Sequence, residues 1–293
     1  MPGVRITTGA QRLEDTVTTA LDTPRVLTDE QITQFWEQGY LLVKGAVSKA
    51  EAEHFRNLIL GLVPPNLEIP PHWHSTAGRI KPMFTPGNHT FDTPDFIPLF
   101  QNEKVYHVAA QLLESPRLRV LDGSIGITLR NQSWGDSSLR SQTLHIDASA
   151  PADIDNFHFT LEEVQVGGCY YFTDVAPEGG GIHVVPGGHR IVEEESRAHP
   201  QGRHLHDNWK RITHLESVEV TGEAGDFALL HHLMPHAASH NRQPTARVAQ
   251  FMRYVREDHP HGAGAPPAPD KYNSLQVAAM NALGRKLFGV EAW

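Results

Sequence analysis

Apolar residues recur with helical spacing in the first third of the chain. The segment beginning at Leu27 can be capped by Thr28 or Asp29 and is stopped by Gly39. Three of its apolar side chains fall on one helical face: Ile32, Phe35 and Trp36. The same spacing predicts further helices over residues 49–62, 101–114 and 273–287, with Ser48 capping the first of them.

From Leu118 onward the pattern changes to short apolar runs with glycine and proline between them. Such runs are typical of strands, and residues 40–44 show the same pattern. The later predicted strands cover 119–121, 124–129, 164–166, 169–172, 182–185, 217–220, 227–230 and 248–254. Strands at this density favour a β-sandwich or barrel.

The order of these elements indicates helices first and a β core afterwards. We expect a flexible arm over residues 1–24 and a single domain over 25–293, because no linker separates its parts. That domain comprises a helical part, a β core, and a tail with a terminal helix: 25–117, 118–256 and 257–293. Residues 64–98 have no period and predict a loop that lines a substrate site.

Composition narrows the possible partners and compartments. The chain has 25 basic and 34 acidic residues and a formal charge of -9, which argues against nucleic acid or an anionic membrane as the main partner. It has no apolar run of about 18 residues and no apolar segment of the secretory kind near Met1. We therefore expect a cytoplasmic protein without a membrane span. The single cysteine, Cys169, excludes an internal disulfide.

The first candidate for chemistry is His145-Ile146-Asp147. On a strand, residues i and i+2 point to the same face, so an imidazole and a carboxylate would reach one point. A polar pair at the end of a strand, facing solvent, would give the same pattern. His236 could add a second imidazole, but neighbouring histidines compete for that role, and position alone does not choose among them: His231, His232 and His240.

Two histidines and one carboxylate, with coordination positions left open, form the ligand set of non-haem Fe(II) oxygenases. Arg247 lies at the start of a predicted strand close to His236 in sequence. A guanidinium inside a barrel needs an anionic partner. A bidentate carboxylate of a bound ligand would provide one, and so would a salt bridge within the protein.

Several motifs occur in a characteristic order: Leu-Thr-x-x-Gln-x-x-x-Phe-x-x-x-Gly-Tyr-Leu at 27–41, His145-x-Asp147, Phe172-Thr173-Asp174 before the GGIHVVPGGH of 180–189, and Gly225-Asp226 through His236 to Arg247. In this order they resemble the phytanoyl-CoA dioxygenase family of Fe(II)/2-oxoglutarate oxygenases. The resemblance spans about residues 27–255 and implies a mainly β fold, with a double-stranded β-helix (jelly-roll, cupin-like) core and N-terminal helices.

The resemblance also implies roles for individual residues. His145, Asp147 and His236 would bind iron, Arg247 would anchor the distal carboxylate of 2-oxoglutarate, and Gln142 would also contact that co-substrate. His231 matches a histidine of the family that does not bind the metal. The Pro186–His189 motif matches a structural turn.

At two positions this sequence has a different residue from the one common in the family. Ala238 replaces a common serine and Ile182 a common threonine. Ser239, and Thr128 or Arg130, are candidates for the secondary contacts to 2-oxoglutarate.

The implied reaction uses Fe(II), 2-oxoglutarate and O2 to oxidise a C–H bond of a small or medium organic molecule, releasing succinate and CO2. Related halogenases have a small residue in place of Asp147, so the resemblance favours hydroxylation, in natural-product or lipid-like metabolism. Four aromatic residues are candidates to line the substrate pocket, although each could equally pack the core: Trp73, Phe84, Trp134 and Phe157.

Two alternatives remain at this stage. One is a cupin-like iron enzyme that does not use 2-oxoglutarate, for which His72-x-His74 is a weak candidate because no glutamate follows at a useful spacing. The other is a barrel without catalytic activity that binds a ligand or a partner and whose histidines are structural. A requirement for 2-oxoglutarate separates the first from the dioxygenase, and metal retention separates the second.

Overall fold

The computed structural model describes residues 24–65, 68, 74–75, 79–82, 89–130, 144–147, 165–198, 215–258 and 269–293. The predicted arm over 1–24 lies outside this part of the chain, except for its last residue. In the described residues no helix has the length and apolarity that crossing a membrane requires.

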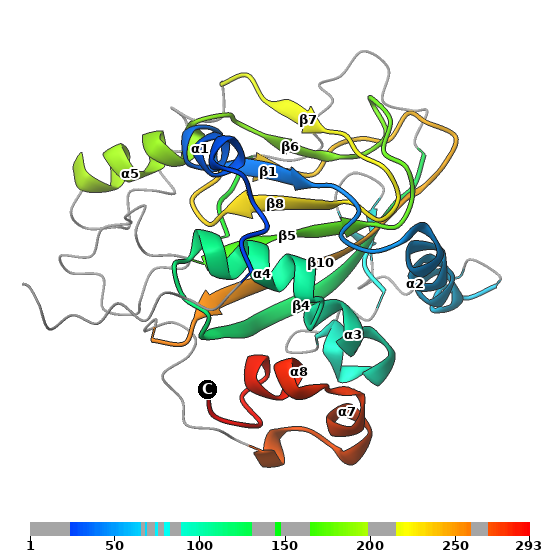
Figure 1. Cartoon of the computed structure of the whole chain (residues 1–293). Coiled ribbons are helices and arrows are strands. Elements are labelled where there is room, and N and C mark those ends of the chain that lie inside the picture. The colour runs from blue at the N-terminus through cyan, green and yellow to red at the C-terminus, as the bar shows by residue number, and fades with distance from the viewer. Residues whose placement is uncertain are drawn as a thin grey trace, which may run out of the picture.

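Two antiparallel sheets form the centre of the described structure (Figure 1). The larger has seven strands, in the order β1 (Tyr40–Val43), β8 (Phe227–His231), β5 (Gln165–Tyr171), β10 (Arg247–Arg256), β4 (Leu118–Thr128), β3 (Arg79–Ile80) and β2 (His74–Ser75). The smaller has the order β7 (Val218–Val220), β6 (Ile182–Val184) and β9 (His236–Ala237). This arrangement confirms the prediction of a mainly β protein.

Helices cover the larger sheet and its ends, and most of them precede the β core, as predicted (Figure 1). They are α1 (Asp29–Gln38), α2 (Lys49–Gly61), η3 (Thr90–Asp92), η4 (Pro94–Phe96), α3 (Ile97–Phe100), α4 (Glu103–Leu112), α5 (Gly188–Ala198), η5 (Pro269–Lys271), α7 (Ser274–Ala279) and α8 (Ala282–Leu287). The helix predicted over 273–287 is therefore two short helices, because the chain turns extended at Met280.

Local sequence explains where the first helices begin and end. Thr28 and Gln31 form a capping box at the start of α1, and Ser48 and Glu51 form another at the start of α2. Gly39 ends α1 with φ 79°, a left-handed conformation that glycine adopts without steric cost. These caps satisfy backbone N–H groups that would otherwise lack partners at the helix ends.

The alternation of side chains along the strands divides the core into two layers. On β10, Val248, Met252 and Tyr254 belong to the larger apolar cluster, which the helices cover. The opposite face of the larger sheet packs on the smaller sheet through residues such as Tyr171, Ile182 and Val184. The two sheets therefore lie face to face, and residues of both line a cavity between them.

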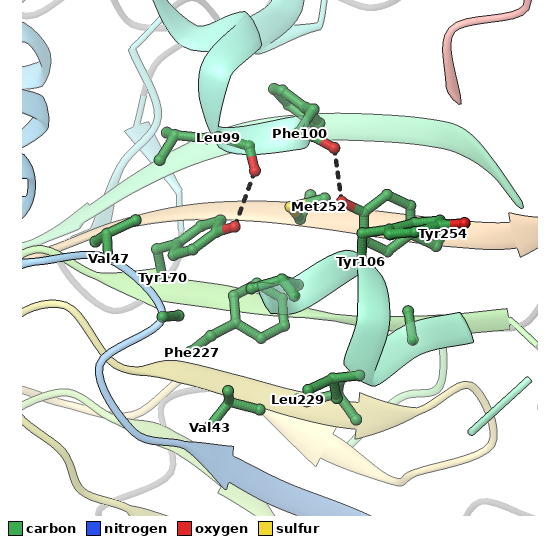
Figure 2. Close-up of a cluster of buried hydrophobic side chains, with 14 of the residues drawn as sticks. Val43, Val47, Leu99, Phe100, Tyr106, Tyr170, Phe227, Leu229, Met252 and Tyr254 are labelled. Carbon is green, nitrogen blue, oxygen red and sulfur yellow. Dashed lines mark hydrogen bonds between the residues drawn. The ribbon is translucent and has the colours of Figure 1, made fainter. Parts of the chain in front are cut away.

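Two buried tyrosines connect the larger sheet to α3 (Figure 2). The hydroxyl of Tyr170 donates a hydrogen bond to the carbonyl oxygen of Leu99 at 2.8 Å, and that of Tyr254 donates to Phe100 at 2.6 Å. Both tyrosines are almost completely buried, and burial raises the pKa of each phenol above its usual range. The hydroxyls therefore stay protonated and continue to donate.

We expect Tyr170→Phe to lower the free energy of unfolding by about 1–2 kcal/mol, because it leaves the Leu99 carbonyl buried without its donor. Urea titration followed by circular dichroism would measure this change. Tyr40→Phe is the control, because Tyr40 is only partly buried, and we expect a change within about 0.5 kcal/mol. Equal stability of Tyr170→Phe and the wild type would contradict the role given to the hydroxyl.

Candidate active site

Three residues from two distant parts of the sequence meet at the cavity between the sheets. Ligand atoms of His145, Asp147 and His236 all lie within 4.8 Å of one another. His236 begins β9, and its backbone N–H and carbonyl pair with those of His145 through two hydrogen bonds of 2.9 Å. The predicted His145–Asp147 strand is thus a single antiparallel bridge, and this bridge places the first histidine beside the second.

The donor set fits a divalent transition metal. Nδ1 of His236 lies 2.9 Å from the carbonyl oxygen of Met234. A carbonyl oxygen can only accept, so Nδ1 carries the proton, and the lone pair of the neutral ring lies at Nε2. That nitrogen faces the carboxylate of Asp147, with an Nε2–Oδ2 distance of 3.7 Å. Two histidines and one carboxylate suit non-haem iron.

Charged neighbours keep Asp147 in the form that binds metal. Burial acts to raise the pKa of its carboxyl, but the nearby His236, Arg253, His145 and Lys81 together hold that pKa below its usual value. The carboxylate is therefore ionised at neutral pH and available as a ligand.

Arg253 supports the Asp147 segment from β10. Its Nη1 donates to the backbone carbonyl of Asp147 at 2.7 Å, and its Nε lies 3.0 Å from both carboxylate oxygens of Asp122. Asp122 lies directly opposite on β4, beside a register shift between Arg253 and Tyr254. Gly167 leaves room for the arginine, since a Cβ there would lie 2.8 Å from its Cγ.

We expect Arg253→Met to weaken iron binding by about 10- to 100-fold, the usual effect of removing a group that orients a metal ligand. Equilibrium dialysis with Fe(II) under anaerobic conditions would measure the dissociation constant. Arg256→Met is the matched control, because Arg256 is on the same strand and, among the described residues, pairs with the exposed Asp258 at 2.6 Å. Equal losses in both variants would contradict a specific positioning role.

Arg247 brings a buried cation to the same cavity. It is the first residue of β10, and its exposed fraction is 1%. Nη2 donates to the hydroxyl of Thr128 at 2.8 Å, whereas Nε and Nη1 have no hydrogen-bond partner among the described residues. No acidic side chain forms a salt bridge with it in that part of the chain. The unsatisfied nitrogens suit an entering carboxylate.

The cavity has a volume of about 160 Å³ and is lined by all four of these predicted residues: His145, Asp147, His236 and Arg247. The histidines that competed with His236 are elsewhere. The rings of His231 and His232 stack on each other at 4.4 Å, and Nδ1 of His231 accepts from the backbone of Leu233 at 3.1 Å.

The remaining predicted residues fall into three groups. Thr128 contacts Arg247 as described. Ser239 is buried and donates its hydroxyl to the carbonyl of Gly181, while its neighbour Ala238 lines the cavity. Five predicted residues lie outside the described part of the chain: Gln142, Trp73, Phe84, Trp134 and Phe157.

Besides Arg253, the cavity contains two basic residues that the sequence analysis missed, Arg79 and Lys81. Arg79 pairs with Thr128 on β4, which pairs with Arg247 on β10, so the three residues form a row across neighbouring strands. Burial and the charge of Arg247 lower the pKa of Arg79 to about 10. Lys81 follows two residues later on the same side, since the intervening Ile80 is buried in the apolar core.

The family comparison agrees with this geometry. The family model described as phytanoyl-CoA dioxygenase (PhyH) matches residues 35–249, which is most of the chain. The chain belongs to the phytanoyl-CoA dioxygenase family. It is accordingly a 2-oxoglutarate-dependent non-haem iron oxygenase, with Fe(II), 2-oxoglutarate and O2 as metal and co-substrates. A search of curated proteins finds no match to this sequence.

Solved structures share the fold of this phytanoyl-CoA dioxygenase family member. The 2-oxoglutarate-dependent carbocyclase SnoK from nogalamycin biosynthesis has 21% identity and a TM-score of 0.58, covering 80% of this chain and 85% of its own. The epimerase SnoN in complex with Fe3+, 2-oxoglutarate and nogalamycin RO has 19% identity and a TM-score of 0.55, with coverages of 78% and 83%.

EctD from S. alaskensis, with 2-oxoglutarate and 5-hydroxyectoine, has 16% identity and a TM-score of 0.53, covering 83% of this chain and 82% of its own. At these identities the likeness concerns the fold, and it confirms the predicted jelly-roll core.

Proposed function

We propose that this oxygenase hydroxylates an unactivated C–H bond of a small or medium organic molecule. In this proposal His145, Asp147 and His236 hold the iron, and Arg247 binds the distal carboxylate of 2-oxoglutarate. One observation carries it: the metal-binding group and a buried, incompletely paired guanidinium line the same cavity. Bound iron and 2-oxoglutarate would supply the oxidising power, with O2 as oxidant and succinate and CO2 as products.

Other residues of the chain position the co-substrate and the substrate. Arg247 and Thr128 fix one end of the co-substrate, and the small Ala237 and Ala238 leave space beside His236. The apolar side chains of Ile182, Leu230 and Phe251 also line the cavity. Such walls hold the carbon skeleton of a substrate and exclude bulk water from the reacting centre.

The choice of hydroxylation rests on Asp147. Its carboxylate completes a set of three protein ligands, so the place that a halide takes in related halogenases is filled here. Solved structures with the same fold support a small-molecule substrate, since SnoN was crystallised with nogalamycin RO and EctD with 5-hydroxyectoine. SnoK and SnoN are described as a carbocyclase and an epimerase, so the assay must detect more than one outcome.

The decisive experiment begins with anaerobic protein. Addition of Fe(II) and then 2-oxoglutarate should produce the charge-transfer absorption band of a chelated ferrous centre. Exposure to O2 with a library of small molecules should release succinate, and mass spectrometry should find products that gain one oxygen atom or lose two hydrogen atoms. Oxygen consumption that needs no 2-oxoglutarate would support the cupin-like alternative. Failure to retain metal would support a binding module.

A further inference from the structure

Basic residues outnumber acidic residues in the part of the cavity lining that the structure describes. Among its lining residues in the described part of the chain, four are basic and two are acidic: Arg79, Lys81, Arg247 and Arg253 against Asp122 and Asp147. Ferrous iron would add two positive charges and 2-oxoglutarate two negative ones. These two contributions cancel, so the described lining residues keep two more basic than acidic groups, although the whole chain has a formal charge of -9.

The four basic residues have different surroundings. Arg253 pairs with Asp122 and holds the backbone of Asp147. Arg247 takes the distal carboxylate in the proposed function, and Arg79 is its neighbour in the cross-strand row. Lys81 lies further along the same face, within electrostatic reach of both Arg79 and the carboxylate of Asp147. Lys81 lines the same cavity as Asp147 and His236.

We propose that the substrate carries an oxyanion, a carboxylate or a phosphate, and that this group binds the ammonium of Lys81 with Arg79 beside it. The inference deepens the proposed function and rests on it. Arg79 in β3 and Lys81, which directly follows that strand, form a short basic rail beside Arg247 in the cavity that also holds the metal-binding group. A rail of this kind would orient an anionic substrate with its carbon skeleton against the apolar wall.

Matched probes test this inference with protein loaded anaerobically with Fe(II) and 2-oxoglutarate. Hexanoate, hexyl phosphate and the uncharged hexanamide share a carbon chain, and isothermal titration calorimetry gives their dissociation constants. We expect at least one oxyanion to bind about tenfold more tightly than hexanamide, the effect of one charge-assisted contact. Comparison of the dissociation constants of hexanoate and hexyl phosphate shows whether the cavity prefers a carboxylate or a phosphate.

Variants of single lysines test whether Lys81 causes the tighter binding of the oxyanion. Lys81→Met should remove the preference for the oxyanion, and Lys81→Arg should keep it. Lys49→Met is the control, because Lys49 is exposed and pairs with Glu223 on the surface, and it should keep the preference. The loss of 2-oxoglutarate affinity in Lys81→Met, read from the charge-transfer band, should be much smaller than that in Arg247→Met.

Three results would overturn the inference: equal binding of hexanamide and both oxyanions, no oxyanion binding up to about 1 mM, or a loss of 2-oxoglutarate affinity in Lys81→Met as large as that in Arg247→Met. The last result would assign Lys81 to the co-substrate. Absence of the charge-transfer band in the wild type would instead count against the proposed function, so the two failures are distinguishable.

Discussion

Replacing either Asp147 or His236 with alanine is expected to remove bound iron and turnover together. Each side chain contributes one of three donors that lie within 4.8 Å of one another, and two remaining donors cannot hold the metal in place. Because loss of a group that only orients a ligand costs about 10- to 100-fold in affinity, loss of a ligand should cost more than about 100-fold. Metal analysis after desalting, together with succinate release, measures both effects.

His232→Ala is the matched control, because His232 is buried close to His236 in sequence but stacks on His231 rather than lining the cavity. It should retain iron at the wild-type ratio. Iron retained by His236→Ala and lost by His232→Ala would show that the wrong histidine has been assigned to the metal.

Arg247→Met is expected to reduce affinity for 2-oxoglutarate by about 100-fold or more, since losing one partner of a buried charge pair costs about 2–5 kcal/mol. The same change should leave the protein without ligand at least as stable as the wild type. In that state the buried guanidinium has two nitrogens without hydrogen-bond partners among the described residues, and methionine removes this penalty.

Thermal unfolding with and without 2-oxoglutarate distinguishes these effects. The wild type should gain stability from the co-substrate, and Arg247→Met should gain almost none. Thr128→Val keeps the guanidinium and removes only its 2.8 Å contact, so it should show a smaller loss of affinity, about tenfold. If Arg247→Met unfolded without ligand while Thr128→Val bound normally, Arg247 would be structural.

Local signals made the helical part of the fold predictable. Thr28, Ser48 and Gly39 each fix a helix boundary through contacts within a few residues, so the sequence alone locates them. Burial was less predictable. On α2, Ala52, Phe55 and Ile59 are buried and Ala50 is exposed, because packing against the sheet selects the buried face of the helix.

Features that depend on distant pairing could not be predicted. β3 consists of Arg79 and Ile80 in a segment with no period, and only its pairing with β2 and β4 defines it as a strand. The two strands predicted from Val164 to Phe172 are one, because Gly167 and Gly168 are required for packing and not for a turn. A Cβ at Gly168 would overlap the carbonyl oxygen of Ala228 on the neighbouring strand.

In the candidate site, too, some residues could be identified from the sequence and others only from the structure. Motif order pointed to His145, Asp147, His236 and Arg247, and the structure brings all four to one cavity. Arg253 could not be singled out, because its role depends on lying opposite Asp122 beside a register shift. A basic residue in a strand is ordinary by itself, and only three-dimensional proximity gives it a function.

The backbone bridge between His145 and His236 links the smaller sheet to the metal. Two hydrogen bonds of 2.9 Å join the same residues whose side chains would share an ion. Release of the ion and fraying of this sheet edge then become a single opening event. Amide hydrogen exchange at these two positions should consequently slow when the ion is bound, giving a measure of occupancy that requires no substrate.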